Sequence, residues 1–197
     1  MAVSMVFFDV GETLVDETRA FEVLADAARV PRLTLFGVMG GLIARGDAHG
    51  RVFELVGVEQ PTWPGYGPDD FYPDVRPCLI ELRRRGRRIG VAGNQPQACE
   101  QFLRDAGLEL DCIGSSAGWG VRKPSNEFFA RLVAEAACAP EEIAYVGDHV
   151  ANDVVPALAA GMVAVHIRRG PWGYLHEPPA AAIRIRSLAE LPEALGV

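Results

Sequence analysis

Short apolar runs alternate with helical stretches through most of this chain, and this alternation constrains the fold more than any other feature. Each run is only a few residues long and ends near a glycine or an aspartate, which is typical of buried strands. The predicted strands cover residues 5–8, 89–92, 111–113, 143–146 and 162–167. Apolar side chains at helical spacing separate these strands. Strict alternation of strand and helix favours an α/β fold, a parallel sheet with helices on both faces.

Residues 17–72 have a different character. Phe21, Leu24 and Ala28 recur at helical spacing, and similar spacing continues to about residue 56. Prolines and glycines between residues 59 and 71 then predict a loop that returns the chain. With 197 residues, the chain is long enough for one α/β domain and a modest helical insertion.

Composition excludes several classes of protein. Hydrophobic residues make up 49% and charged residues 23%, so disorder is not the main state. A net charge of −7 argues against a basic surface for nucleic acid or membranes, and the arginine-rich run at 83–88 is expected to be a solvated helix end. Four cysteines without a C-x-x-C pair, and an N-terminus without a signal-peptide pattern, favour a reducing cytoplasm. Oligomeric state has no signature in the sequence.

Charged residues gather at the predicted strand ends. Asp9 follows the first strand, Asp148 follows the strand at 143–146, and Asp153 comes five residues later. Lys123 stands before a proline that starts a predicted helix. Parallel sheets bind ligands at the carboxyl ends of their strands, so these groups are expected to meet there. Clustered carboxylates repel unless a cation lies between them, and Mg²⁺ takes carboxylate, carbonyl and water oxygens.

These motifs resemble those of the haloacid dehalogenase superfamily across nearly the whole chain. The segment Asp9-Val10-Gly11-Glu12-Thr13 is similar to the first family motif, D-x-D-x-[TV]. Lys123-Pro124 matches the third motif, and Gly147-Asp148 with Asp153 matches the fourth, G-D-x-x-x-x-D. The resemblance implies a Rossmannoid core at residues 1–16 and 73–197, with residues 17–72 forming a small helical cap inserted after the first motif.

The resemblance also implies a Mg²⁺-dependent hydrolase, a phosphatase for a small phosphorylated metabolite. Asp9 would be the nucleophile and would form an aspartyl-phosphate. Asp9, Asp148 and the main-chain carbonyl of Gly11 would hold the metal, with Asp153 acting through a water or orienting Asp148. Lys123 would stabilise the nucleophile and the transferring group. Substrate binding would fall to three residues at the second and third motifs: Gly93, Asn94 and Lys123.

Two positions depart from the family pattern. Phosphatases of the family usually carry an aspartate two residues after the nucleophile as general acid, and here that residue is Gly11. Glu12 and His149 are the alternatives that the sequence offers for this role. Gly93 stands where the family usually has Ser or Thr, which removes one phosphate hydrogen bond. Since a missing general acid typically costs about 10²–10⁴ in rate, we expect a preference for good leaving groups such as aryl or acyl phosphates.

Two other functions fit these departures. One is a 2-haloacid dehalogenase-like hydrolase, in which aspartate displaces halide from carbon without a metal; the retention of Asp148 and Asp153 argues against it. The other is a weakly catalytic protein that binds a phosphorylated ligand, which the changes at Gly11 and Gly93 would allow. Phosphatase assays and chelation separate the three.

Overall fold

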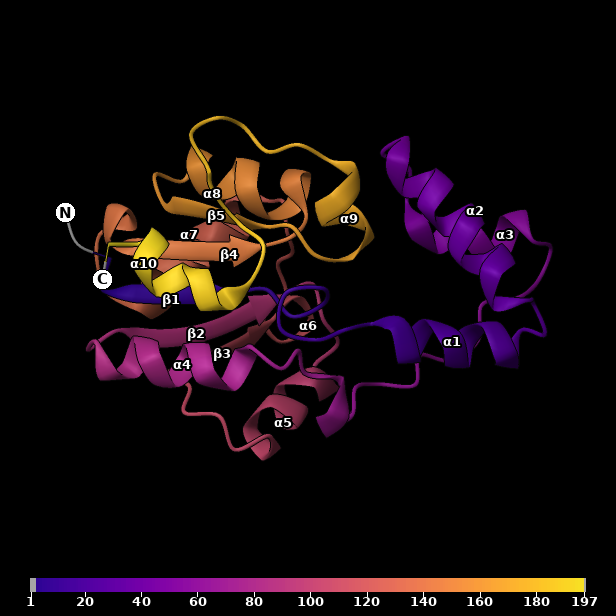
Figure 1. Cartoon of the computed structure of the whole chain (residues 1–197), viewed down its shortest axis with the longest axis horizontal. Coiled ribbons are helices and arrows are strands. Elements are labelled where there is room, and N and C mark those ends of the chain that lie inside the picture. The colour runs from indigo at the N-terminus through magenta and orange to yellow at the C-terminus, as the bar shows by residue number, and fades with distance from the viewer. Residues whose placement is uncertain (1–2, 197) are drawn as a thin grey trace.

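The computed structural model describes residues 3–196, and within them six parallel strands form one sheet (Figure 1). The strand order is β3-β2-β1-β4-β5-β6. The strands are β1 (Met5–Phe8), β2 (Arg88–Gly93), β3 (Cys112–Ser115), β4 (Ile143–Gly147), β5 (Val163–Ile167) and β6 (Ile183–Ile185). The predicted parallel α/β sheet is therefore confirmed. β6 was not predicted, because its three residues include Arg184 and form no apolar run.

Strand β1 lies at the centre of the sheet, and all four of its side chains are buried. Val6 and Phe8 enter the hydrophobic cluster on one face, whereas Met5 and Phe7 enter the cluster on the other. A strand buried on both faces requires a continuous apolar sequence, which explains why Met5-Val6-Phe7-Phe8 shows no polar alternation.

Helices cover both faces of the sheet (Figure 1). α4 (Val75–Arg84), α5 (Ala98–Asp105) and α10 (Leu191–Ala194) contribute to the cluster that contains Val6. α7 (Asn126–Ala136) and α8 (Val155–Ala159) contribute to the cluster that contains Phe7. α6 (Ser116–Trp119) and α9 (Gly170–Leu175) follow β3 and β5. β3 begins one residue later than predicted, at Cys112. Asp111 lies just before it, and its side chain accepts a hydrogen bond from the Ile89 amide at 2.6 Å.

Residues 17–72 hold the helices α1 (Thr18–Ala27), α2 (Arg32–Ala44) and α3 (Val52–Leu55). They lie beyond the carboxyl ends of the strands, on the right in Figure 1. They share a third hydrophobic cluster, to which the sheet-bearing part of the chain contributes the buried residue Trp172 of α9. This position agrees with a cap over the strand ends, while the division into two domains stays a prediction.

The helices of this segment are short. No single helix among residues 3–196 has the length and apolar character needed to cross a membrane. α1 and α2 would meet the length and composition criteria only as a pair, and they are bent by 117° relative to each other. Leu24 of α1 and Leu35 of α2 are instead buried in the same cluster.

Candidate active site

The site lies where the strand order reverses. From β1 the chain proceeds outward to β2 and β3 on one side, and from β4 to β5 and β6 on the other. Asp9 follows β1 and Asp148 follows β4, so both emerge at the carboxyl edge of neighbouring strands. The Asp9 amide donates a hydrogen bond to the Val146 carbonyl at 2.9 Å, which holds Asp9 in line with β4. Such a crevice is the usual ligand site of open α/β sheets.

Asp153 reaches the same place from the helical turn Val150–Val154. Its Oδ2 accepts a hydrogen bond from the His149 amide at 3.0 Å, and the side chain is fully buried. A Cβ at Gly147 would lie 2.4 Å from Asp153 Oδ2, closer than any real contact. Glycine at position 147 is therefore required for the turn to fold back over the strand end.

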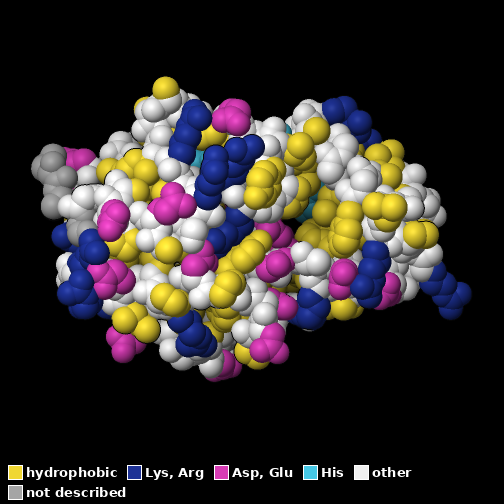
Figure 2. Space-filling model, in the orientation of Figure 1, with side chains coloured by type: hydrophobic (Ala, Val, Ile, Leu, Met, Phe, Trp, Pro, Cys, Tyr) yellow, Lys and Arg dark blue, Asp and Glu magenta, His cyan; other side chains and the backbone are white. Residues whose placement is uncertain are grey.

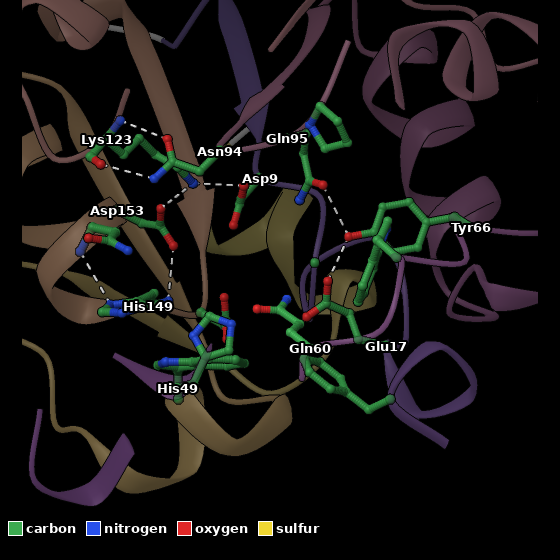
Figure 3. A pocket seen from close by; sticks show the side chains of 17 residues that line it. Asp9, Glu17, His49, Gln60, Tyr66, Asn94, Gln95, Lys123, His149 and Asp153 are labelled. Carbon is green, nitrogen blue, oxygen red and sulfur yellow. Dashed lines mark hydrogen bonds and ion pairs between the residues drawn. The ribbon is translucent and has the colours of Figure 1, made fainter. Parts of the chain in front are cut away.

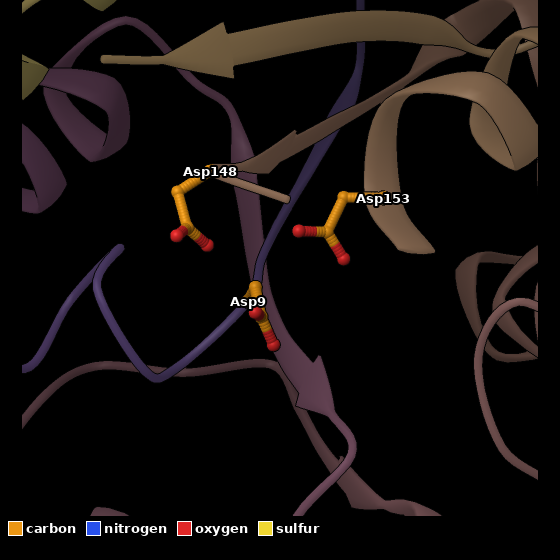
Figure 4. Close-up of side chains that lie close together, drawn as sticks. All are labelled: Asp9, Asp148 and Asp153. Atoms are coloured by element: carbon orange, nitrogen blue, oxygen red, sulfur yellow. The ribbon is translucent and has the colours of Figure 1, made fainter. Parts of the chain in front are cut away.

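The three carboxylates of Asp9, Asp148 and Asp153 converge on one space (Figure 4). Each offers an oxygen within 4.8 Å of the others, and all three residues are buried. Oδ2 of Asp148 is buried and finds no hydrogen-bond partner within residues 3–196. Burial, followed by repulsion from Asp153 and Asp9, raises the pKa of Asp148 well above its ordinary value. An oxygen-only cluster with an unsatisfied carboxylate fits a hard divalent cation such as Mg²⁺.

Lys123 supplies the positive charge within this cluster. Its ammonium lies 2.7 Å from Asp9 Oδ1 and 2.6 Å from Asp153 Oδ1, and the residue is only 3% exposed. Burial opposes its charge, but Asp153 and Asp9 outweigh burial and raise the pKa of Lys123 well above its usual range. It is also the one lysine in the sequence, since every other cationic side chain is an arginine. The surface cations drawn in Figure 2 are therefore arginines, and they stand among acidic and apolar groups.

Asn94 fixes the backbone of Lys123. Its side-chain Nδ2 donates to the Lys123 carbonyl at 2.9 Å, and the Lys123 amide donates to Asn94 Oδ1 at 2.8 Å. This reciprocal pair joins the end of β2 to the loop before α7 (Figure 3). Five residues that the sequence predicted for the site thus lie together: Asp9, Asn94, Lys123, Asp148 and Asp153.

Gly93 lies directly beside the predicted nucleophile. A Cβ at this position would lie 2.3 Å from Asp9 Oδ1, so a larger residue would collide with the carboxylate in its present orientation. The space that a Ser or Thr side chain would use is therefore taken by Asp9 itself. Gly93 is buried and is not among the described residues that line the cavity.

Gly11 lines the cavity, and the carboxyl of Glu17 occupies the space beside it. A Cβ at Gly11 would lie 2.6 Å from Glu17 Oε1. The Tyr66 hydroxyl donates to the same oxygen at 2.6 Å, and Gln95 Oε1 lies 3.2 Å from that hydroxyl (Figure 3). Burial, together with nearby Glu12 and Asp9, raises the pKa of Glu17 to about 8. Sequence reasoning missed Glu17, because nothing in a six-residue separation signals that its side chain folds back over Gly11.

The two alternatives for the missing acid are differently placed. Glu12 adopts a left-handed backbone conformation (φ 52°), and its carboxylate accepts hydrogen bonds from the Tyr72 hydroxyl at 2.6 Å and the Glu17 amide at 3.0 Å. It is not among the described residues that line the cavity. His149 does line the cavity, but burial and then the charge of Lys123 lower its pKa to about 4. A neutral imidazole at pH 7 is a weak proton donor.

The cavity itself has a volume of about 360 Å³. The catalytic candidates line it together with aromatic residues from the helical segment and from α9. The aromatic residue that α9 contributes to the cavity is Trp172. Trp119 instead packs 5.3 Å from Phe128, ring to ring.

Comparisons with known proteins agree with this geometry. The model of the haloacid dehalogenase-like hydrolase family matches residues 3–161. A glyceraldehyde 3-phosphate phosphatase of Methanopyrus kandleri is 36% identical over 105 residues, covering 51% of this chain and 45% of that protein. A phosphoserine phosphatase of Thermus thermophilus is 35% identical over 131 residues, covering 63% and 51%. The chain thus spans about half the length of each of these two relatives.

Solved structures share the fold. A magnesium-bound hydrolase of the same superfamily from Bacillus subtilis superimposes with a TM-score of 0.72 over the whole of both chains, at 17% identity. Identity this low supports the architecture alone. The family match, which covers most of the sequence, and the strand-end motifs together identify the chain as a member of the haloacid dehalogenase-like hydrolase family.

Proposed function

We propose that this chain is a Mg²⁺-dependent phosphatase that acts on a small phosphorylated metabolite through an aspartyl-phosphate on Asp9. The observation that carries the proposal is the buried cluster in which Asp9 lies 2.7 Å from the Lys123 ammonium, beside Asp148 and Asp153. The names of the phosphatase relatives, glyceraldehyde 3-phosphate phosphatase and phosphoserine phosphatase, support a phosphorylated small molecule as substrate.

The reaction proceeds in two displacements. An Asp9 oxygen attacks phosphorus, a P–O bond forms, and the bond between phosphorus and the leaving-group oxygen breaks with its electron pair going to that oxygen. Water then attacks the phosphoryl group of the aspartyl-phosphate, which releases inorganic phosphate and regenerates the Asp9 carboxylate. Burial raises the pKa of Asp9, and the Lys123 ammonium opposes this rise; Lys123 also orients the carboxylate and would balance charge on the transferring oxygens.

Asp9, Asp148 and the Gly11 carbonyl would hold the magnesium, with Asp153 orienting Lys123 and the neighbouring ligands. Bound magnesium supplies Lewis-acid neutralisation of phosphoryl charge. Gly93 lies beside Asp9 and Asn94 lines the cavity, and their backbone would bind phosphate oxygens. Residues 17–72 would act as a cap that selects the leaving group and excludes bulk water. The four free cysteines fit a cytoplasmic location.

Hydrolysis of 4-nitrophenyl phosphate and acetyl phosphate tests the proposal. Activity should require Mg²⁺, disappear with EDTA, and be lost in Asp9→Asn, which keeps the side-chain shape but removes the nucleophile. Borohydride reduction during turnover should convert Asp9 to homoserine, detectable by mass spectrometry. A 2-haloacid dehalogenase would leave these phosphates intact and would release halide from a 2-haloacid even in EDTA. A protein that only binds phosphates would show saturable phosphate binding without turnover.

Leaving-group dependence tests the consequence of Gly11. With no acid at that position, 4-nitrophenyl phosphate should be hydrolysed faster than ethyl phosphate by at least about 10²-fold at saturating Mg²⁺. Equal rates for the two substrates would show that another group donates the proton efficiently.

A further inference from the structure

Six aromatic rings follow one another around the cavity above Asp9. Successive ring centroids are 6.0, 4.9, 6.2, 5.7 and 5.6 Å apart. In order of contact the rings belong to His149, Trp172, His49, Phe21, Trp63 and Tyr66, which we call the aromatic wall. His149 of this wall follows β4, Trp172 belongs to α9, and the other four rings belong to residues 17–72. Separate parts of the chain thus build one apolar surface.

Cationic groups are scarce in this cavity. Among the described residues that line it, Lys123 is the one lysine or arginine, and its ammonium is already shared by Asp9 and Asp153. The nearby Arg19 is bound to Asp70 at 2.6 Å and to the Gly65 carbonyl at 2.9 Å. A second anionic group on a substrate would therefore enter without a counter-charge, beside several carboxylates, which is strongly unfavourable.

Apart from the acidic side chains, the polar groups of the cavity are neutral hydrogen-bonding side chains. Gln60, Gln95 and Asn152 present amides to the cavity. At about 360 Å³ the cavity is at the small end of ligand pockets, which span about 300–1,000 Å³. This volume suits a phosphoryl group with one ring or a short chain.

We propose that the site takes monophosphates whose leaving group is uncharged and carries an aromatic or apolar ring, which packs against the aromatic wall. The inference rests on the proposed phosphatase function and adds the chemical class of the leaving group. Ring-on-ring contact stabilises such a group, and the lack of a free cation rejects phosphates that bear a carboxylate or a second phosphate.

Matched substrates separate recognition from chemistry. Benzyl phosphate and methyl phosphate have leaving alcohols of nearly equal acidity, so their ratio of kcat/KM reports on the ring. We expect benzyl phosphate to be favoured by about 10- to 100-fold. 4-Carboxybenzyl phosphate adds only a charge, and we expect it to be at least about tenfold worse than benzyl phosphate. Assays at pH 8 keep ordinary imidazoles neutral, so His49 adds no cation.

Variants assign the effect to the wall. Trp63 lies in the loop outside the helices and is partly exposed, so Trp63→Ala should fold and should lower the benzyl to methyl ratio. Tyr174→Ala is the control: Tyr174 lies on α9 near Trp172, is 62% exposed and does not line the cavity, so the ratio should stay unchanged. Gln60→Arg places a cation in the cavity and should improve 4-carboxybenzyl phosphate relative to benzyl phosphate.

A ratio near one in the wild type, or 4-carboxybenzyl phosphate matching benzyl phosphate, would overturn the inference while leaving the phosphatase intact. Binding of benzylphosphonate and methylphosphonate to the Mg²⁺-loaded protein, measured by calorimetry, gives a readout without turnover. If 4-nitrophenyl phosphate and acetyl phosphate are not hydrolysed, the proposed activity fails, and a stronger binding of benzylphosphonate then still supports the wall. Equal affinity for the two phosphonates would refute it.

Discussion

Replacing Gly11 with aspartate supplies the acid that the family pattern expects, yet we predict that this change alone does little. A Cβ at position 11 falls 2.6 Å from Glu17 Oε1, whereas ordinary contact begins near 3.4 Å. The Glu17 carboxyl must then retreat by about 0.8 Å, which weakens its 2.6 Å hydrogen bond from Tyr66. Complete loss of that bond would cost about 0.5–1.5 kcal/mol, which is the upper limit for this shift. The two adjacent carboxyls also compete for the same space and disfavour each other's ionisation.

Removing Glu17 at the same time frees the space. We expect Gly11→Asp/Glu17→Ala to hydrolyse ethyl phosphate about 10²-fold faster than the wild type, the lower end of the range for a general acid. Gly11→Asp alone should stay within about fivefold of the wild type, since its carboxyl is misplaced. The assay is kcat for ethyl phosphate at saturating Mg²⁺, with Glu17→Ala and Gly11→Ala as single controls. 4-Nitrophenyl phosphate needs no proton donor and should respond little. Equal acceleration by the single and the double variant would refute the idea that Glu17 blocks position 11.

Three further changes probe the charges. Lys123→Met leaves Asp9 and Asp153 buried without their ammonium, so the free energy of unfolding by urea in EDTA should fall by about 3–5 kcal/mol; a loss under about 1 kcal/mol would contradict this. Asp148→Asn removes a buried carboxylate whose pKa is raised, so the melting temperature in EDTA should rise and the stabilisation by Mg²⁺ should vanish; an unaltered Mg²⁺ response would exclude Asp148 as a ligand. Burial opposes ionisation of Asp74, but hydrogen bonds from Arg169 and Ser187 outweigh it and lower its pKa, so its stabilisation is present above about pH 4 and is lost as pH falls through the folded pKa. Asp74→Asn should therefore cost about 1.5–3 kcal/mol at pH 7 and flatten the loss of stability between pH 5 and pH 3, as measured by urea titration across that range.

The sequence was informative where local pattern and chemistry coincide. The run before Asp9 is apolar at every position, as expected for a strand that is buried on both faces of the sheet. The same holds for the strand before Asp148. Lys123 is the one lysine in a sequence whose other cationic side chains are all arginines, which marks the position independently of motif spacing. Its compact ammonium fits between two carboxylates. The fold and the group of charges at the strand ends could thus be predicted.

Other features depend on tertiary folding and had no local signature. The chain reverses after β1 through Glu12, which has a left-handed backbone conformation, and this reversal brings the Glu17 side chain back to Gly11. A non-glycine residue in this conformation cannot be predicted from the sequence. The aromatic wall assembles rings separated by more than a hundred residues, such as Phe21 and Trp172, and no spacing rule brings them together. The strand at 183–185 is too short to produce a pattern.

Trp172 has a consequence for motion. The residue belongs to α9 beside the sheet, but its indole is 8% exposed and sits among the side chains of α1, α2 and α3. Any swing of these helices away from the strand ends must draw that indole out of an apolar environment and into water. The indole is therefore a fluorophore at the contact between α9 and the helices of residues 17–72, and its emission would shift to longer wavelength if these helices moved away from the strand ends.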